Sequence, residues 1–376
     1  MRRAARLLLS GFVVIAVLSC APGATVMDAR ADARAISFAD LPGWADDDHA
    51  AALATFARSC TRIAGLDASA PLDSKTGTSP IYGRAGDWQP ACAAALQSVA
   101  PGSARGFFEH WFQPVRLAAE RGLFTGYYEP EMRGALTRHG PYQTPVLAPP
   151  PDFTMRAGGA GFPTRAEIED GALDHNALVL VLLESPVDAF FLHVQGSGRV
   201  RLENGETVRL AFAAKSGHEY TSIGKVLIDR GAIPREEVSM QTIRAWMEAN
   251  PAEGRDVMRQ NQSYIFFRIL RDIDPELGPP GAEGVNLTPR RSLAIDRAHH
   301  PLGALFWLTT RHPTPDGRGE VPFAHLVVAQ DTGSAIKGVQ RGDIFFGSGD
   351  EPGEIAGRMK AEGELTALVP NTIAPR

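Results

Sequence analysis

The chain has 376 residues, enough for two or three domains with buried cores. Hydrophobic residues make up 44% and charged residues 22%, with 38 Gly and 28 Pro, a composition typical of a soluble globular protein with many turns. The net charge of −5, and the lack of any run of Lys and Arg interleaved with aromatic residues, argue against nucleic acid as a partner.

The N-terminal stretch resembles an export signal. Three arginines among the first six residues precede an apolar run, Leu7–Leu18, which is short for a membrane span and suits the core of a signal peptide. Residues 17–20 (VLSC) resemble a lipobox, in which Cys20 would be lipidated and become the mature N-terminus. The alternative is cleavage near Ala24 with loss of Cys20. Either route predicts an exported protein whose residues 1–20 are not part of the fold.

Three helices are predicted after an Ala/Asp/Arg-rich tether at residues 21–45. Acidic residues 46–48 open the first helix, whose apolar positions recur on one face. Pro90 is expected to start a second helix that runs to Val99, and the aromatic-rich segment Gly106–Leu117 suits a third. These helices are expected to pack as one layer.

Export determines how the cysteines are interpreted. An oxidising compartment favours a disulfide between Cys60 and Cys92, and two buried free thiols are the alternative. A zinc site is poorly supported, because CxxC, HExxH and clustered His/Cys spacings are absent from the sequence.

The segment Leu123–Gly134 has the pattern of a strand broken by Pro130. Tyr127 and Tyr128 are adjacent, so they point to opposite faces of the strand, one toward a core and the other toward a surface. Together with Thr125, these aromatic and hydroxyl groups suit sugar rings, which have an apolar face and a polar rim.

From about Gly140 the composition becomes proline-rich and then β-rich. A strand at Phe190–Gln195 is expected to turn at Gly196-Ser197-Gly198 and to lead into a hairpin at Asn204-Gly205, because Asn-Gly accepts positive φ angles. The glycines around Ser197 could cradle a ligand with backbone N–H groups, or could simply form a β-bulge.

The region after this hairpin is predicted to be helical and then extended. Thr221 caps a helix that Gly231 ends, and Pro234 starts another that ends before Pro251. The alternation in Gln262–Ile269 predicts a strand.

The last third consists of short apolar runs separated by Gly- and Pro-rich links. These runs are Leu293–Asp296, Leu305–Leu308, Leu326–Ala329, Ile344–Phe346 and Leu365–Val369. Short strands of this kind suggest a small barrel rather than a nucleotide-binding sheet. Because the sequence has neither GxGxxG after a strand nor a Walker loop, no organic cofactor is expected.

Three aspartates next to these runs are the candidate catalytic groups. Asp331 and Asp343 are 12 positions apart, and Asp296 closes an earlier run. Each alone is typical of a turn, but three acids at strand ends in one region favour a site. An apolar run follows Asp343, so partial desolvation would raise its pKa and keep it protonated, as a general acid for a glycosidic bond must be. Asp331, between Gln330 and Thr332, has polar neighbours and fits that role less well.

Two other interpretations of the aspartates are weaker. Asp331–Ser334 matches the DTGS signature of aspartic proteases, but that chemistry needs two carboxylates that share a proton. The chain has no second signature, since residues 73–75 (DSK) fail at the third position. A calcium or magnesium site built from the three aspartates would lack the DxDxDG spacing, so no metal is expected.

Six blocks of the chain together resemble the membrane-bound lytic transglycosylase A family, in the family's order. They are FTGYYEP (124–130), FFLHVQGSGRVRL (190–202), YTSIGKVLIDRG (220–231), NQSYIFF (261–267), RRSLAIDRAHHPLGALFWL (290–308) and AQDTGSAIKGVQRGDIFFGSG (329–349). The resemblance implies an α+β fold, mainly β with helices. In it, residues 46–139 and 236–376 form a double-psi β-barrel domain with the N-terminal helices, and residues 140–235 form a smaller inserted β domain. The glycan would lie in the groove between the two domains.

The resemblance also implies an activity. Family members cleave the β-1,4 bond between N-acetylmuramic acid and N-acetylglucosamine in peptidoglycan without water, and the C6 hydroxyl of the muramoyl residue attacks to leave a 1,6-anhydro end. One aspartate acts first as acid and then as base, and the matching motif at residues 341–344 assigns that role to Asp343. Gly342 stands where the family often has Phe or Ala, a departure that leaves the aspartate and the apolar residues after it in place.

The other site residues follow from the same resemblance. Asp331 is expected to support Asp343, with Asp296 as a more structural third acid and Lys337 biasing the local field. Groove contacts are expected from Thr125, Tyr128, Gln195, Gly196, Ser197, Gly198 and Tyr264.

The expected partners are peptidoglycan glycan strands and other wall enzymes. The protein is expected to be a periplasmic monomer, held at the outer membrane through Cys20. Two alternatives to a lytic transglycosylase stay open, namely a non-catalytic wall-binding module like the expansin barrels and a hydrolase on the same fold.

Overall fold

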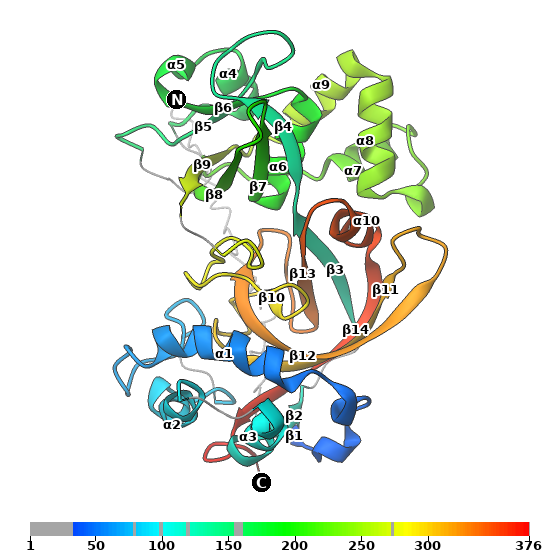
Figure 1. The fold of residues 1–376 in the computed structure, drawn as a ribbon. Helices are drawn as coiled ribbons and strands as arrows, with labels where there is room; N and C mark the ends of the chain where they lie inside the picture. The colour runs from blue at the N-terminus through cyan, green and yellow to red at the C-terminus, as the bar shows by residue number, and fades with distance from the viewer. Residues whose placement is uncertain are drawn as a thin grey trace, which may run out of the picture.

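The computed structural model describes residues 33–77, 80–97, 101–117, 121–153, 161–271 and 274–375. The expected signal peptide, Cys20 and residues 21–32 of the expected tether lie outside these ranges. The rest of the predicted tether is part of the fold, because Arg34–Ala35 pair with a barrel-side strand and Leu41 and Trp44 are buried in the core. The described chain forms two β domains with helices around them, which confirms the α+β class (Figure 1). Within the described ranges, no helix combines the length and the apolar character needed to cross a membrane.

Six strands close into a barrel in the order β14-β11-β12-β10-β13-β3, with β3 paired back to β14. The pairs β10–β12 and β13–β3 are parallel, and the other four are antiparallel. The strands are β3 (Gly122–Glu129), β10 (Ser292–Ile295), β11 (Leu305–Pro313), β12 (Glu320–Thr332), β13 (Arg341–Ser348) and β14 (Lys360–Pro370). Their inward side chains are fully buried and merge with the N-terminal helices into one apolar core.

The N-terminal helices pack below the barrel in Figure 1. They are α1 (His49–Ile63), α2 (Ala85–Ala95) and α3 (Ala104–Trp111), followed by β2 (Phe112–Arg116), which joins β1 (Arg34–Ala35) to β14. Asp48 caps α1, as its sequence indicated, and a disulfide joins Cys60 of α1 to Cys92 of α2.

Two boundaries in this layer differ from the sequence prediction. Helix α2 begins before Pro90, because the carboxylate of Asp87 accepts from the backbone N–H of Arg84 and so caps an earlier start. The segment predicted as a helix up to Leu117 leaves the helix at Trp111, because residues 112–116 pair with β14 instead.

The second domain is one six-stranded sheet in the order β5-β6-β4-β7-β8-β9. Its strands are β4 (Glu131–Ala135), β5 (Thr144–Leu147), β6 (Val179–Leu183), β7 (Ser197–Leu202), β8 (Thr207–Lys215) and β9 (Ile265–Leu270). Its helices are α4 (Arg165–Glu169), α5 (His175–Leu178), α6 (Pro186–Gln195), α7 (Ile223–Asp229), α8 (Met240–Ala249) and α9 (Pro251–Gln260). The domain has apolar clusters of its own, separate from the barrel core.

This domain interrupts the barrel between β3 and β10, as an inserted domain should. The expected boundaries, residues 140 and 235, are too narrow, because β4 pairs with β7 and β9 pairs with β8 in the second sheet. Strand pairing therefore extends the insertion to residues 131–270. In Figure 1, β3 continues directly into β4 and so connects the two domains.

The strand predicted at Phe190–Gln195 is wrong, since these residues belong to helix α6. Ser185 caps this helix and Pro186 occupies its first turn. Both residues favour a helix start, so the apolar run that follows them is helical. Gly196 ends the helix with a φ of 79°, and Ser197 then begins β7. The hairpin at Asn204-Gly205 is confirmed.

Candidate active site

Asp331 and Asp343 lie in one row that crosses four barrel strands. Ala294 of β10 is the cross-strand partner of Asp331 on β12 and of Asp343 on β13, and Asp343 in turn faces Thr125 on β3. Residues in register on neighbouring strands point to the same side of a sheet. The two aspartates therefore share a face, two strands apart, which separates their Cα atoms by roughly 10 Å.

Thr125 fixes the carboxyl group of Asp343. Its hydroxyl donates to Asp343 Oδ1 at 2.8 Å, and it accepts from Arg341 Nη2 at 2.9 Å. Because the guanidinium can only donate, the hydroxyl hydrogen is directed to the aspartate. Arg341, two residues before Asp343 on β13, is thus the cation of this site, a role that the sequence prediction did not assign to it.

Asp331 is held by three donors. The hydroxyl of Tyr127 donates to Asp331 Oδ2 at 2.9 Å, and the backbone N–H groups of Ala282 and Thr332 donate to Oδ1, each at 2.9 Å. Ala282 belongs to the segment that returns from the inserted domain to the barrel. The return segment is therefore bonded to the barrel at this carboxylate.

Both acids have raised pKa values. Burial raises the pKa of Asp343 to about 6, against the hydrogen bond from Thr125 and the charge of Arg341, which lower it, and the charge of Asp331 adds to the increase. Burial also raises the pKa of Asp331, although its three hydrogen bonds act in the opposite direction. A carboxyl group with a pKa of about 6 can both donate and accept a proton near neutral pH.

Asp296 is in a different environment. Burial raises its pKa, but backbone N–H groups of Gly338 and Ala298 and the charge of Lys337 lower it more, so the net pKa is below the ordinary value. The Lys337 ammonium lies 3.9 Å from Asp296 Oδ1 and is mostly exposed. Lys337 therefore acts on Asp296, whereas Arg341 is the cation that acts on Asp343.

The predicted groove contacts occupy three kinds of position. Thr125 is bonded to Asp343, as described above. Tyr128 is buried in the barrel core, so Tyr127, on the opposite face of β3, is the tyrosine at the aspartates. Tyr264 is buried inside the second domain against His193, which makes it a core residue rather than a groove contact.

The Gln195–Gly198 segment has a structural explanation. Gln195 accepts from the backbone N–H of Tyr128 at 3.1 Å and so connects α6 to β3. A Cβ atom at Gly198 would lie 2.5 Å from the methyl carbon of Met132, which explains the glycine by close packing. Gly196 ends α6, and Ser197 is buried.

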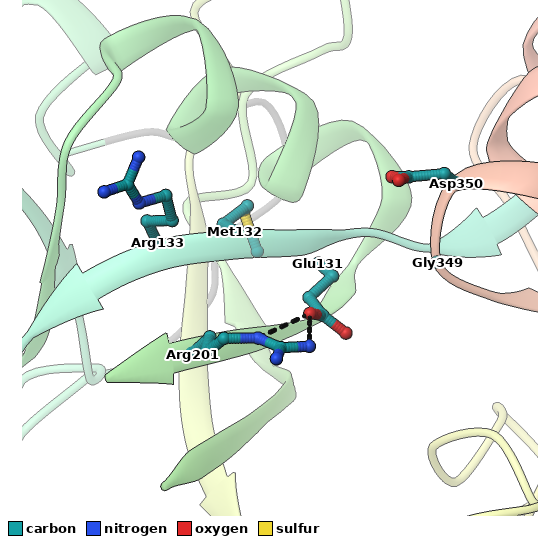
Figure 2. Close-up of a pocket in the computed structure, with 6 residues that line it drawn as sticks. All are labelled: Glu131, Met132, Arg133, Arg201, Gly349 and Asp350. Atoms are coloured by element: carbon teal, nitrogen blue, oxygen red, sulfur yellow. Dashed lines mark hydrogen bonds and ion pairs between the residues drawn. The ribbon is translucent and has the colours of Figure 1, made fainter. Parts of the chain in front are cut away.

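A cavity of about 390 Å³ lies between the domains. It is lined by Glu131, Met132 and Arg133 of β4, Arg201 of β7, and Gly349 and Asp350 at the start of α10 (Asp350–Arg358). Figure 2 shows Arg201 paired with Glu131, and Asp350 across the space from β4. Neither Asp331 nor Asp343 lines this cavity. In the described part of the chain, no group of three His, Cys, Asp or Glu side chains could hold a metal ion.

The fold and the site define a barrel protein with an inserted β domain and a pair of half-buried acids. Residues 123–268 match the MltA specific insert domain, and residues 291–369 match the 3D domain. The chain belongs to the membrane-bound lytic murein transglycosylase A family.

Individual relatives agree with this assignment. The chain is 34% identical over 303 residues to membrane-bound lytic murein transglycosylase A of Vibrio cholerae, covering 77% of this chain and 75% of the relative. It is 39% identical over 252 residues to the Escherichia coli K12 protein of that name, and this match spans 65% of each protein.

Two solved structures show that the similarity extends to the fold. The Agrobacterium tumefaciens membrane-bound lytic murein transglycosylase superposes with a TM-score of 0.78 at 33% identity, covering 91% of this chain and 98% of that one. Escherichia coli MltA with bound chitohexaose gives a TM-score of 0.67 at 29% identity, covering 89% and 91%.

Proposed function

We propose that this protein is a peptidoglycan lytic transglycosylase in which Asp343 is the general acid and then the general base. One observation carries the proposal, namely a half-buried carboxyl group with a pKa of about 6, held by Thr125 on the face that it shares with a second acid. The substrate class follows from the relatives, which are named lytic murein transglycosylases, and from the chitohexaose bound to one of them.

The reaction starts with Asp343 neutral. Its proton passes to the glycosidic oxygen as the bond from that oxygen to C1 of N-acetylmuramic acid breaks, which leaves an oxocarbenium-like sugar and an Asp343 carboxylate. The carboxylate then takes the proton from the C6 hydroxyl, and O6 bonds to C1 to form the 1,6-anhydro ring. Asp343 ends protonated and no water is consumed, so one carboxyl group completes the cycle.

Thr125 determines which oxygen of Asp343 carries this proton. Its hydroxyl is directed to Oδ1, so Oδ2 is the oxygen left to hold the transferred proton. Asp331 contributes through its charge, which raises the pKa of Asp343 and favours the positive charge that develops on the sugar. Asp296 then serves the structure, by fixing the backbone at Gly338.

The first test is mass spectrometry of the fragments released from purified peptidoglycan. We expect muropeptides about 18 Da lighter than the reducing sugars, the mass of one water, because O6 replaces water as the nucleophile. We expect Asp343→Asn to lose essentially all turnover while it still binds glycan, since the amide cannot donate and recover the proton.

The other outcomes identify the alternatives. Reducing ends would show a hydrolase on this fold, and an active Asp343→Asn protein would refute the assigned acid. Binding without any product from either protein would indicate a non-catalytic wall-binding module.

We also propose that the protein acts in the cell envelope. The relatives are named membrane-bound, and the sequence before the described residues resembles a lipoprotein signal with Cys20 at its end. Intact mass measurement of protein purified from membranes tests this, because a diacylglyceryl group on Cys20 adds a defined mass that a Cys20→Ala variant would lack.

A further inference from the structure

The end of β3 carries a buried carboxylate that the catalytic scheme does not use. Glu129 is fully buried, at the point where the chain leaves the barrel for the inserted domain. It accepts from Arg199 Nε of β7 and from Arg209 Nη2 of β8, both at 2.9 Å, and from the hydroxyl of Ser348 on β13 at 2.7 Å. One side chain thus connects both domains.

The same two arginines also bind the segment by which the chain returns to the barrel. Arg199 Nη2 donates to the carbonyl of Pro275 at 2.9 Å, and Arg209 donates to the carbonyls of Asp274 at 3.2 Å and Leu277 at 2.9 Å. Both connections between the domains, outgoing and returning, are therefore bonded to one pair of guanidinium groups. Five residues after Leu277, the returning segment places the N–H of Ala282 on Asp331.

Strand β3 links this cluster to the aspartates. Thr125, Tyr127 and Glu129 alternate along β3 and so lie on one face of it. They bind, in order, Asp343, Asp331 and the arginine pair. A rotation of the inserted domain about this junction would therefore act on the strand and on the return segment that hold both acids.

Net stability is a poor explanation for such a cluster. Removing two arginines and a carboxylate from water costs about as much as their attraction returns, so buried ion pairs add little to folding free energy. The ion pairs instead fix the relative orientation of the groups that they join, because the planar guanidinium groups form hydrogen bonds only at fixed angles.

We propose that Glu129 is a positioning residue that sets the orientation of the inserted domain on the barrel. Through that orientation it sets the spacing of the two walls that hold the glycan, a consequence that rests on the proposed function. Glu129 touches neither substrate nor the reacting atoms. Its effect falls on glycan affinity and leaves the pKa of Asp343 unchanged.

The test is a distance measurement between nitroxide labels on the two domains by double electron–electron resonance. The labels are placed on Leu136→Cys and Val321→Cys, two exposed positions in the insert and the barrel, in a full-length Cys20→Ser background. We expect a narrow distribution with Glu129 present and a broadened or shifted one in Glu129→Gln. The matched control is Glu184→Gln, which removes an exposed partner of Arg133 and should change nothing.

Affinity for chitohexaose, measured by calorimetry in an Asp343→Asn background, is the second readout. We expect Glu129→Gln to weaken it about tenfold and Glu184→Gln to leave it unchanged. If Glu129→Gln does not fold, Arg199→Lys is the second variant. Lysine keeps the positive charge but cannot donate to Glu129 and to the carbonyl of Pro275 in the fixed geometry of a guanidinium group, so it should give the same changes to a smaller degree. An unchanged distance distribution in the folded variants would overturn the proposal, and so would a changed distribution with unaltered affinity. The distances need no catalysis, so they remain informative if the transglycosylase assignment fails.

Discussion

Thr125 forms a hydrogen-bonded bridge between the guanidinium group of Arg341 and the carboxyl group of Asp343. Its hydroxyl accepts from the guanidinium and donates to the carboxylate, so it lowers the pKa of Asp343 while burial raises it. Asp331 raises the same pKa through its negative charge. The two neighbours therefore act on the working acid with opposite signs.

These signs predict opposite shifts in the pH dependence of the reaction. The acid must be protonated, so kcat/KM should fall as pH rises through about 6. Thr125→Val removes a hydrogen-bond donor to the ionised form of Asp343. This should raise the pKa of Asp343 and shift the fall in kcat/KM to higher pH by about one unit. Asp331→Asn removes the negative charge that repels the Asp343 carboxylate, so it should lower the pKa of Asp343 and shift the fall in kcat/KM to lower pH. Profiles of kcat/KM against pH for both variants test this prediction. Shifts in the same direction would contradict the opposite roles assigned to Thr125 and Asp331.

The sequence predicted the acids better than their neighbours. Asp343 was identifiable because an apolar run follows it, and its raised pKa agrees with the expected desolvation. Gln330 beside Asp331 predicts a polar environment for this acid, yet Gln330 points to the opposite face and donates to Ser59 of α1 in a buried network. Which of Tyr127 and Tyr128 faces the acids depends on the register of β3 against β13, and local sequence does not contain that information.

At the scale of elements, two glycines allow α10 to pack against β3. A Cβ atom at Gly126 of β3 would lie 2.9 Å from the Cα atom of Ala356, and one at Gly353 of α10 would lie 2.7 Å from the ring of Tyr128. The helix thus lies almost on the backbone of the strand that carries Thr125.

Gly126→Ala should therefore force α10 and β3 apart. We expect a loss of about 1–3 kcal/mol in the free energy of unfolding of the barrel domain, together with reduced turnover, because the neighbouring residue Thr125 moves with the strand. Gly106→Ala is the matched control, since a Cβ atom there meets nothing within 4 Å and Ala favours a helix over Gly. Urea denaturation and turnover of both variants test the prediction, which equal stabilities would contradict.

Elements with local signals were predictable and those fixed by distant pairing were not. The cap at Asp48, the hairpin at Asn204-Gly205 and the five barrel strands of the last third agree with the structure. Helix α6 was mistaken for a strand because its apolar run lacks a clear period, although Ser185 and Pro186 before it mark a helix start.

At the scale of the whole molecule, the barrel and the insert each bury a core of their own, and the Glu129 cluster is one of the contacts that join them. The barrel core includes the N-terminal helices, whereas the insert has separate apolar clusters of its own. The insert boundaries were misjudged for the same reason, since β4 and β9 are assigned to the second sheet only by partners far away in sequence.

Two cores predict thermal unfolding that is not two-state. We expect the calorimetric enthalpy to exceed the van't Hoff enthalpy, because each domain buries a core that can melt separately. Glu129→Gln should separate the two transitions further, because it weakens one of the contacts between the domains. Differential scanning calorimetry measures this, and a single transition with equal enthalpies in both proteins would show that the domains unfold as one unit.

Closure of the barrel depends on β14, the last barrel strand in chain order. β14 pairs with β11, β2 and β3, and Lys360–Gly363 face Thr125–Gly122. Its partner β3 precedes it by more than two hundred residues, so loop-closure entropy opposes this pairing until the chain between them has become compact. The insert lies within that interval and can fold first, which shortens the effective loop. Strand β3, which places Thr125 beside Asp343, is then fixed between β13 and β14 late in folding, so the candidate site takes its final geometry only after synthesis has delivered the last strand.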